Sequence, residues 1–296
     1  MTNPGHEEAQ QAYQLGNALA EQGKLDQAVA QYERALALGP DNALAHNNLG
    51  LALAMQGKLD RAMVHFERAL ALKPDDAEAH NNLGNVLGMQ GKTDQAVAHF
   101  ERALALDPDN ALAHNNLGNA LMLQGRIDQA VIHYEHALAL DPDDALAHNN
   151  LGNTYRAQGR TDQAVAHYER ALALDPDDAL VHNNLGLALA AQGRNDQAVA
   201  HYERALALKP DYAEAHNNLG LALAMQDPLD QAVIHYERAL ALDPDNAMAH
   251  NNLGNALMLQ SRIDQAVTHY ERALSLKPDD TVTHNGLLFA LNYLSD

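Results

Sequence analysis

Residues 43–76 read ALAHNNLGLALAMQGKLDRAMVHFERALALKPDD, and a closely similar stretch returns every 34 residues along the chain. The proline of this stretch recurs without slippage at Pro40, Pro74, Pro108, Pro142, Pro176, Pro210, Pro244 and Pro278. A fixed period of this length is typical of a stacked array, in which each unit covers the apolar face of its neighbour. The period therefore predicts the fold and places the question of function on the surface of the array.

Each repeat reads as two helices joined by tight turns. Residues 43–56 lack proline and are rich in alanine and leucine, which favour helix, and Gly57 suits a helix that ends in a left-handed turn. A second helix should run from Asp60 to Leu72, with Asp60 capping its first amides. Pro74 ends it, and Asp75-Asp76 should cap the next helix. We number the positions of a repeat from Ala43 as position 1, and call the two helices A and B.

Apolar spacing indicates which side of each helix is buried. In helix A the buried stripe should hold His46, Leu49, Gly50 and Leu53, at i, i+3, i+4 and i+7. In helix B it should hold Ala62, Phe66 and Ala69. The glycine and the alanines are small where two backbones should approach closely.

This pattern resembles the tetratricopeptide repeat (TPR) in its Leu49-Gly50 pair, Ala62, Phe66, Ala69 and Pro74, which recur with conservative changes in eight repeats. The resemblance implies an all-α, right-handed superhelical solenoid of TPR-like helix-turn-helix repeats. We expect an N-terminal tail over 1–8, eight repeats over 9–280 and a C-terminal half-repeat helix over 281–296. The chain departs from the family in carrying histidine early in helix A, as at His46, where a large aromatic residue is usual.

Composition excludes several classes of function. The formal net charge is −20, whereas nucleic acids and anionic membranes need clustered lysine and arginine. The chain has no cysteine, so a disulfide, a thiolate metal site and a cysteine nucleophile are excluded. No apolar stretch could span a bilayer, and the polar start does not resemble a signal peptide. We expect a cytoplasmic protein without cofactor. Since its acids and histidines recur equivalently in every repeat and serine is rare, we also expect no enzyme activity.

A row of asparagines follows the A helices. In the family, A helices line the concave wall, and helical spacing places positions 2, 5, 6, 9, 12 and 13 on one face, which we call the A-helix face. Position 6 holds Asn48, Asn82, Asn116, Asn150, Asn184, Asn218 and Asn252; position 9 adds Asn85, Asn119 and Asn153, and position 12 adds Arg156. An amide both donates and accepts, so such a row can bind the main chain of an extended peptide.

The row resembles the asparagine ladder in the repeat region of the O-linked N-acetylglucosamine transferases. That resemblance implies a peptide-binding groove, although the catalytic domain of those enzymes is absent. In the alternative interpretation, one asparagine of each Asn-Asn pair bonds the neighbouring repeat and only holds the stack together. A carboxylate-clamp mode is not expected, because positions 2, 5 and 6 carry no lysine or arginine.

These observations predict a scaffold that binds a protein or an extended peptide. Two alternatives stay open. The last helix, over 281–296, carries apolar residues nearly all round, which favours a homo-oligomer joined through this helix. The chain could also be the non-catalytic repeat arm of a larger enzyme.

Histidines recur at two positions of the repeat. Position 4 holds them from His46 to His250 and continues at His284, and position 23 holds them from His65 to His269. We interpret position 4 as a packing site rather than a metal site, and position 23 as a solvated flank. Protonating all 17 histidines would change the formal charge from −20 to −3, so self-repulsion should fade as the pH falls.

Two turns deviate from the glycine rule. Asp227-Pro228 and Ser261 stand where the other repeats have their A–B turn. We expect tolerated drift, with a hinge as the alternative.

Overall fold

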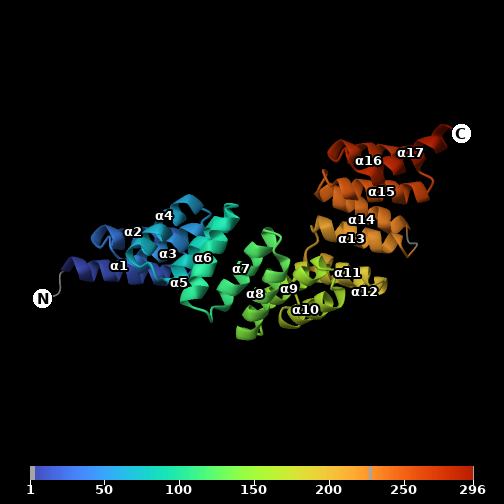
Figure 1. Cartoon of the computed structure of the whole chain (residues 1–296). Coiled ribbons are helices and arrows are strands. Elements are labelled where there is room, and N and C mark those ends of the chain that lie inside the picture. Colours follow the sequence, from blue (N-terminus) through green and yellow to red (C-terminus); the bar gives the residue numbers. More distant parts are fainter. Residues whose placement is uncertain (1–3, 227–228, 296) are drawn as a thin grey trace. The chain divides into compact units, whose positions relative to one another are not determined.

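The computed structural model describes residues 4–226 and 229–295, and all regular structure in these ranges is α-helical (Figure 1). The helices are α1 (Pro4–Glu21), α2 (Leu25–Leu38), α3 (Ala43–Met55), α4 (Leu59–Leu72), α5 (Ala77–Met89), α6 (Thr93–Leu106), α7 (Ala111–Leu123), α8 (Ile127–Leu140), α9 (Ala145–Ala157), α10 (Thr161–Leu174), α11 (Ala179–Ala191), α12 (Asn195–Leu208), α13 (Ala213–Ala224), α14 (Leu229–Leu242), α15 (Ala247–Leu259), α16 (Ile263–Leu276) and α17 (Thr281–Ser295). The predicted all-α architecture of helix-turn-helix repeats is confirmed, with odd-numbered A helices and even-numbered B helices.

The chain forms two compact units, Met1–Asn150 and Leu151–Asp296, and the boundary falls inside α9. In the first unit each A helix packs on the B helix of its own repeat and on the B helix before it, as α3 does on α4 and α2. A helices of consecutive repeats also touch, as α1 touches α3 and α3 touches α5. The second unit repeats this scheme from α10 to α17.

The first helix starts earlier than the sequence predicted. α1 begins at Pro4, so residues 4–8 are helical rather than part of a tail. Proline is tolerated in the first turn of a helix, where its missing N–H is not needed. The residues after Gly5 in this segment are good helix formers, so nothing there ends the helix.

Asn or Asp caps the described A helices in several repeats, as predicted. The side chain of Asn42 accepts from the Ala45 amide at 3.1 Å, and that of Asp76 accepts from the Ala79 amide at 3.2 Å. The cap predicted at Asp60 is wrong, because α4 begins one residue earlier and its N-cap is Lys58, without a side-chain bond. Asp60 lies in the first turn, where the helix dipole favours an acid, and accepts from Gln90 Nε2 of the next repeat at 2.8 Å.

The A–B turns depend on a left-handed residue. Gly57 has φ +74°, and the amide of Lys58 then closes the turn on the Leu53 carbonyl at 2.9 Å. Ser261 keeps this conformation with φ 60°, and the Arg262 amide bonds Leu257 at 2.9 Å. Ser261 therefore forms the same A–B turn as Gly57 does. The hinge considered at Asp227-Pro228 lies outside the described residues.

The buried stripe of the repeat is confirmed. Leu49, Leu53, Ala62 and Phe66 are fully buried, and His46 is buried beside them. The reason for Gly50 differs from the prediction: a Cβ there would lie 2.8 Å from the Phe66 ring, so the glycine makes room for an aromatic side chain rather than for a second backbone. The glycine at position 8 faces the aromatic residue of helix B in all eight repeats.

No helix in the described part of the chain combines the length and apolar character needed to cross a bilayer.

Candidate functional site

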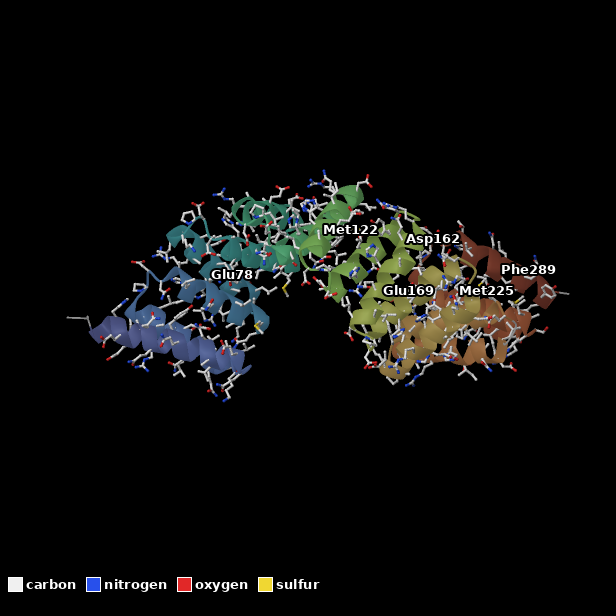
Figure 2. The ribbon with its side chains drawn as sticks, turned by 90° about the horizontal axis from the view of Figure 1, so that it is seen from below. Glu78, Met122, Asp162, Glu169, Met225 and Phe289 are labelled. Atoms are coloured by element: carbon white, nitrogen blue, oxygen red, sulfur yellow. The ribbon has the colours of Figure 1, made fainter. Side chains whose placement is uncertain are left out.

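The A-helix face carries exposed apolar side chains at positions 2, 9 and 13. Their seven- and four-residue spacings place these positions on one side of the helix. Met89 is 68% exposed and Leu123 is 74% exposed, although both side chains are large and apolar. The other exposed members are Leu44, Leu51, Met55, Leu112, Leu146, Leu180, Leu221, Met225, Met248 and Leu259. Figure 2 labels Met225, the C-cap residue of α13, together with Met122 at position 12 of α7.

Asparagines at positions 5 and 6 form bonds between repeats. In the first unit, Nδ2 of Asn82 donates to Oδ1 of Asn47 at 3.2 Å, from position 6 of one repeat to position 5 of the repeat before it. The same bond joins Asn116 to Asn81, Asn150 to Asn115, Asn218 to Asn183 and Asn252 to Asn217, at 3.0–3.1 Å. We call this set the amide ladder. In the first repeat pair, Asn48 donates instead to Tyr13 and Asn17.

The ladder is the arrangement that the alternative interpretation of the sequence predicted. Each of these ladder bonds uses one of the two N–H groups of the donating position 6 amide, since an amide has two donors and an oxygen acceptor. Asn82, Asn116, Asn150 and Asn252 are half-buried, whereas Asn184 and Asn218 are buried. The position 6 asparagines therefore hold repeats together, and in the half-buried cases part of the amide still reaches the surface.

The asparagines at position 9 accept from the tyrosines of helix B. Tyr134 donates to Asn119 at 2.7 Å and Tyr168 donates to Asn153 at 2.8 Å. Asn85 differs, because its repeat carries Phe100 in place of tyrosine and offers no hydroxyl. The sequence held a signal for these contacts, since a tyrosine follows 15 residues after Asn17, Asn119, Asn153 and Asn255.

Charge is sparse on the A-helix face. Arg156 of α9 is exposed, and burial raises the pKa of Tyr168 while the Arg156 guanidinium beside it opposes the rise. Glu78, at position 2 of α5 and labelled in Figure 2, accepts from Nδ2 of Asn47 at 3.1 Å. Glu78 was not among the site residues expected from the sequence, and it gives a position 5 amide an acceptor in the next repeat.

The two rows of histidines form pairs. Nδ1 of His46 lies 3.0 Å from Nδ1 of His65, and Nε2 of His46 lies 3.0 Å from the Pro40 carbonyl oxygen. Because a carbonyl only accepts, Nε2 of His46 carries the proton, so in the neutral pair His65 donates to His46. The same Nδ1–Nδ1 contact joins His80 to His99, His114 to His133, His182 to His201, His216 to His235 and His250 to His269.

These pairs correct the interpretation of position 23. Its histidines are half-buried hydrogen-bond partners of position 4, and not a solvated flank. Burial lowers the pKa of His65, and the neighbouring His46 lowers it further. For His133, burial with His114 and His136 nearby lowers the pKa to about 4. No group of three or more histidines and acids in the described ranges could hold a metal ion.

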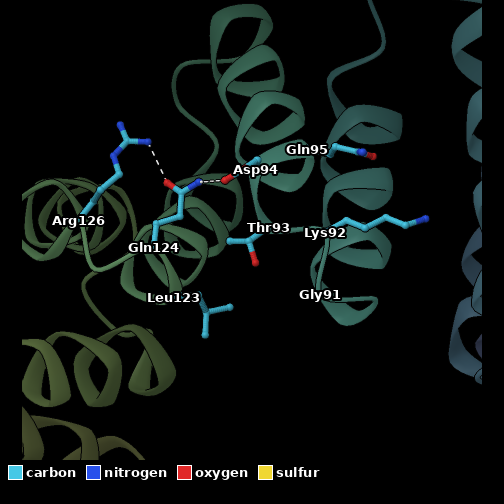
Figure 3. Close-up of a pocket in the computed structure, with 8 residues that line it drawn as sticks. All are labelled: Gly91, Lys92, Thr93, Asp94, Gln95, Leu123, Gln124 and Arg126. Carbon is cyan, nitrogen blue, oxygen red and sulfur yellow. Dashed lines mark hydrogen bonds between the residues drawn. The ribbon is translucent and has the colours of Figure 1, made fainter.

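A wide hollow at the turn edge of the first unit is polar and already bonded (Figure 3). It measures 720 Å³ and lies between the A–B turns of two consecutive repeats. Gln124 donates to Asp94 at 2.7 Å and accepts from Arg126 at 3.0 Å. Gln90–Asp60 and Gln192–Asp162 repeat the first of these bonds. We therefore assign the hollow to repeat-to-repeat bonding and place the candidate site on the A-helix face.

Family models match most of the chain. A model described as TPR repeat matches residues 16–57, 53–91, 152–193, 188–227 and 229–261. Models described as Tetratricopeptide repeat match residues 81–145, 247–280 and 133–166. A search of the curated proteins found no match.

Solved structures share the fold. The chain is 21% identical to a chain of the APC/C hetero-tetramer Cut9-Hcn1, with a TM-score of 0.73 over 90% of this chain and 52% of that one. It thus spans about half the length of that chain. PilF of Pseudomonas aeruginosa is 24% identical, with a TM-score of 0.64 over 71% of this chain and 95% of that one. YrrB, described as a TPR protein with an unusual peptide-binding site, is 25% identical, with a TM-score of 0.52 over 63% of this chain and 96% of that one.

Proposed function

The chain belongs to the tetratricopeptide repeat family, and from this we propose that it is a non-catalytic scaffold that binds an extended protein segment along its A-helix face. Members of this family are typically scaffolds for protein–protein interaction. The observation that carries the proposal is the row of exposed leucines and methionines at positions 2, 9 and 13. Methionine adapts to irregular partner surfaces, and a large exposed apolar row is typical of an interaction surface.

The half-buried asparagines support the same proposal. Asn82 and Asn116 each give one N–H to the amide ladder. The second N–H and the oxygen remain for the backbone of a bound segment. A segment held in this way would gain main-chain hydrogen bonds from the amides and side-chain contacts from the leucines and methionines.

The proposal is tested by quantitative pull-down from a lysate of the native source. One variant carries Met55→Ser, Met89→Ser and Leu123→Ser on the A-helix face. The control variant carries Val64→Ser and Ile132→Ser, which are exposed positions of helices α4 and α8. We expect the first variant to lose the specific partner and the control to keep it. Equal recovery by both variants contradicts the proposal.

A second candidate function is self-association through α17. Leu288, Phe289, Leu291, Tyr293 and Leu294 are exposed on this helix, and Phe289 is labelled in Figure 2. In addition, Gly286 stands where a ladder asparagine would be, and Oδ1 of Asn251 is buried without a partner. We propose a second copy of the chain as the partner that covers the apolar side of α17.

A further inference from the structure

Two hollows on the A-helix face of the first unit occupy equivalent places in consecutive repeat pairs. The first lies between α1 and α3 and measures 290 Å³, and the second lies between α3 and α5 and measures 370 Å³. Glu21, Tyr32 and Met55 line the first, and the residues 34 positions later, Met55, Phe66 and Met89, line the second. Volumes of about 300–1,000 Å³ are typical of ligand pockets. We call them the first and second A-face pockets.

The two pockets differ in chemistry. The first contains the Glu21 carboxylate, which is exposed, and the hydroxyl of Tyr32, which donates to Asn17 at 2.9 Å. The second has Met55 in place of Glu21 and Phe66 in place of the tyrosine, and keeps a methionine, Met89, where the first has Met55. No lysine or arginine lines either pocket. The first therefore suits a basic side chain, whose apolar stem can lie along Leu51, and the second suits an apolar side chain.

The spacing of the pockets fixes the spacing of the ligand side chains. α1 touches α3 and α3 touches α5, and helices in contact have axes about 8–10 Å apart. An extended polyproline-type chain advances about 3.1 Å per residue, so three residues span about 9 Å. Two residues of a β-strand span only about 6.6 Å and point to one side. Side chains three residues apart thus match consecutive pockets.

Each pocket is lined by two asparagines, one from position 9 (Asn17 or Asn85) and one from position 6. Asn48 lines the first and Asn82 lines the second, at the same position of α3 and α5. Asn82 uses one N–H in the amide ladder, so the rest of its amide can contact the backbone of a segment that runs between the pockets.

We propose that the first unit binds an extended segment in which a basic residue lies three residues from an apolar residue, the basic side chain in the first A-face pocket and the apolar side chain in the second. This inference rests on the proposed function and specifies its partner for the first unit. The carboxylate of Glu21 selects the charge, and Met55 and Met89 select the apolar side chain.

The test measures fluorescence anisotropy of labelled synthetic peptides against the full chain. The peptides share a proline- and serine-rich background and carry one lysine and one leucine two, three or four residues apart, in both orders. We expect the three-residue spacing in one order to bind at least about fivefold more tightly than the other spacings. We also expect replacement of its leucine by serine to weaken binding about tenfold or more, because a buried leucine side chain contributes that much.

Charge reversal tests the first pocket. Glu21→Lys should lower the affinity for the lysine peptide about three- to fivefold, in line with the loss of an exposed ion pair. The same variant should bind the peptide that carries glutamate in place of lysine more tightly than wild type does. Glu67→Lys is the matched control, because it makes the same change of net charge on an exposed site of α4. Since both sites are exposed, the variants should fold, which circular dichroism verifies.

Two results overturn the inference: equal affinity for all three spacings, or a Glu21→Lys variant that binds the lysine peptide as wild type does. Either result leaves the proposed function intact if the serine variant of the A-helix face still loses its natural partner. If the serine variant of the A-helix face also keeps its natural partner, the proposed function itself is contradicted.

Discussion

Replacing Asn82 with alanine tests the amide ladder as a source of stability. The variant removes the 3.2 Å bond to Asn47, whose side chain is 3% exposed, and leaves the Asn47 oxygen without its donor. An orphaned buried acceptor costs about 1–3 kcal/mol. Alanine favours helix over asparagine by about 0.6 kcal/mol, which offsets part of that cost. We therefore expect a net loss of about 0.5–2 kcal/mol.

Urea denaturation followed by circular dichroism measures the effect. With a slope of about 2 kcal/mol per M, the midpoint should fall by about 0.3–1 M. Asn85→Ala is the matched control, because Asn85 lies on the same helix, is half-buried, and belongs to a repeat that carries Phe100 in place of the tyrosine. We expect the control to be neutral or slightly more stable. If Asn82→Ala and Asn85→Ala unfold at the same urea concentration, the ladder does not stabilise the stack.

Three further predictions concern the turns, the histidine pairs and α17. Ser261→Gly should raise the free energy of unfolding by about 0.5–1 kcal/mol, because a non-glycine residue at φ 60° is strained; a loss of stability in urea denaturation would refute this. Burial lowers the folded-state pKa of His65, His99, His201 and His235, so the unfolded chain takes up protons at a higher pH than the folded chain does. The free energy of unfolding should therefore be highest above about pH 6.5 and should fall as the pH drops below that value. An unchanged urea midpoint between pH 7.5 and 5.5 would count against the histidine pairs. Phe289→Glu should abolish any concentration-dependent sedimentation of the chain, and a wild-type chain that sediments as a monomer at all concentrations would remove the α17 candidate.

The sequence predicted the fold because the determinants of the fold are local and repeated. Pro74, Gly57 and the buried stripe of Leu49, Leu53 and Phe66 each act within one repeat, and the period multiplies the signal. The start of α1 was predicted too late, since the resemblance defined where a repeat begins, whereas the helix itself extends back through residues 4–8. The role of Gly50 became clear only from the three-dimensional structure, because spacing cannot tell whether a small residue faces a backbone or a ring.

The site was predicted less completely, because it depends on which side chains meet across repeats. The sequence placed the asparagines on one face, but peptide binding and bonding between repeats would both use asparagine at the same positions. Only the geometry shows that Asn82 donates to Asn47. The histidine pairs were missed for the same reason: positions 4 and 23 lie 19 residues apart, and no pattern within a single helix reports their contact.

The binding face is tested most directly by photocrosslinking. A benzophenone amino acid is placed at Met89, on the A-helix face, and separately at Val64, an exposed site of helix α4. After irradiation with the partner recovered by pull-down, we expect a covalent adduct from position 89 and none from position 64. An adduct from position 64 with none from position 89 would contradict it.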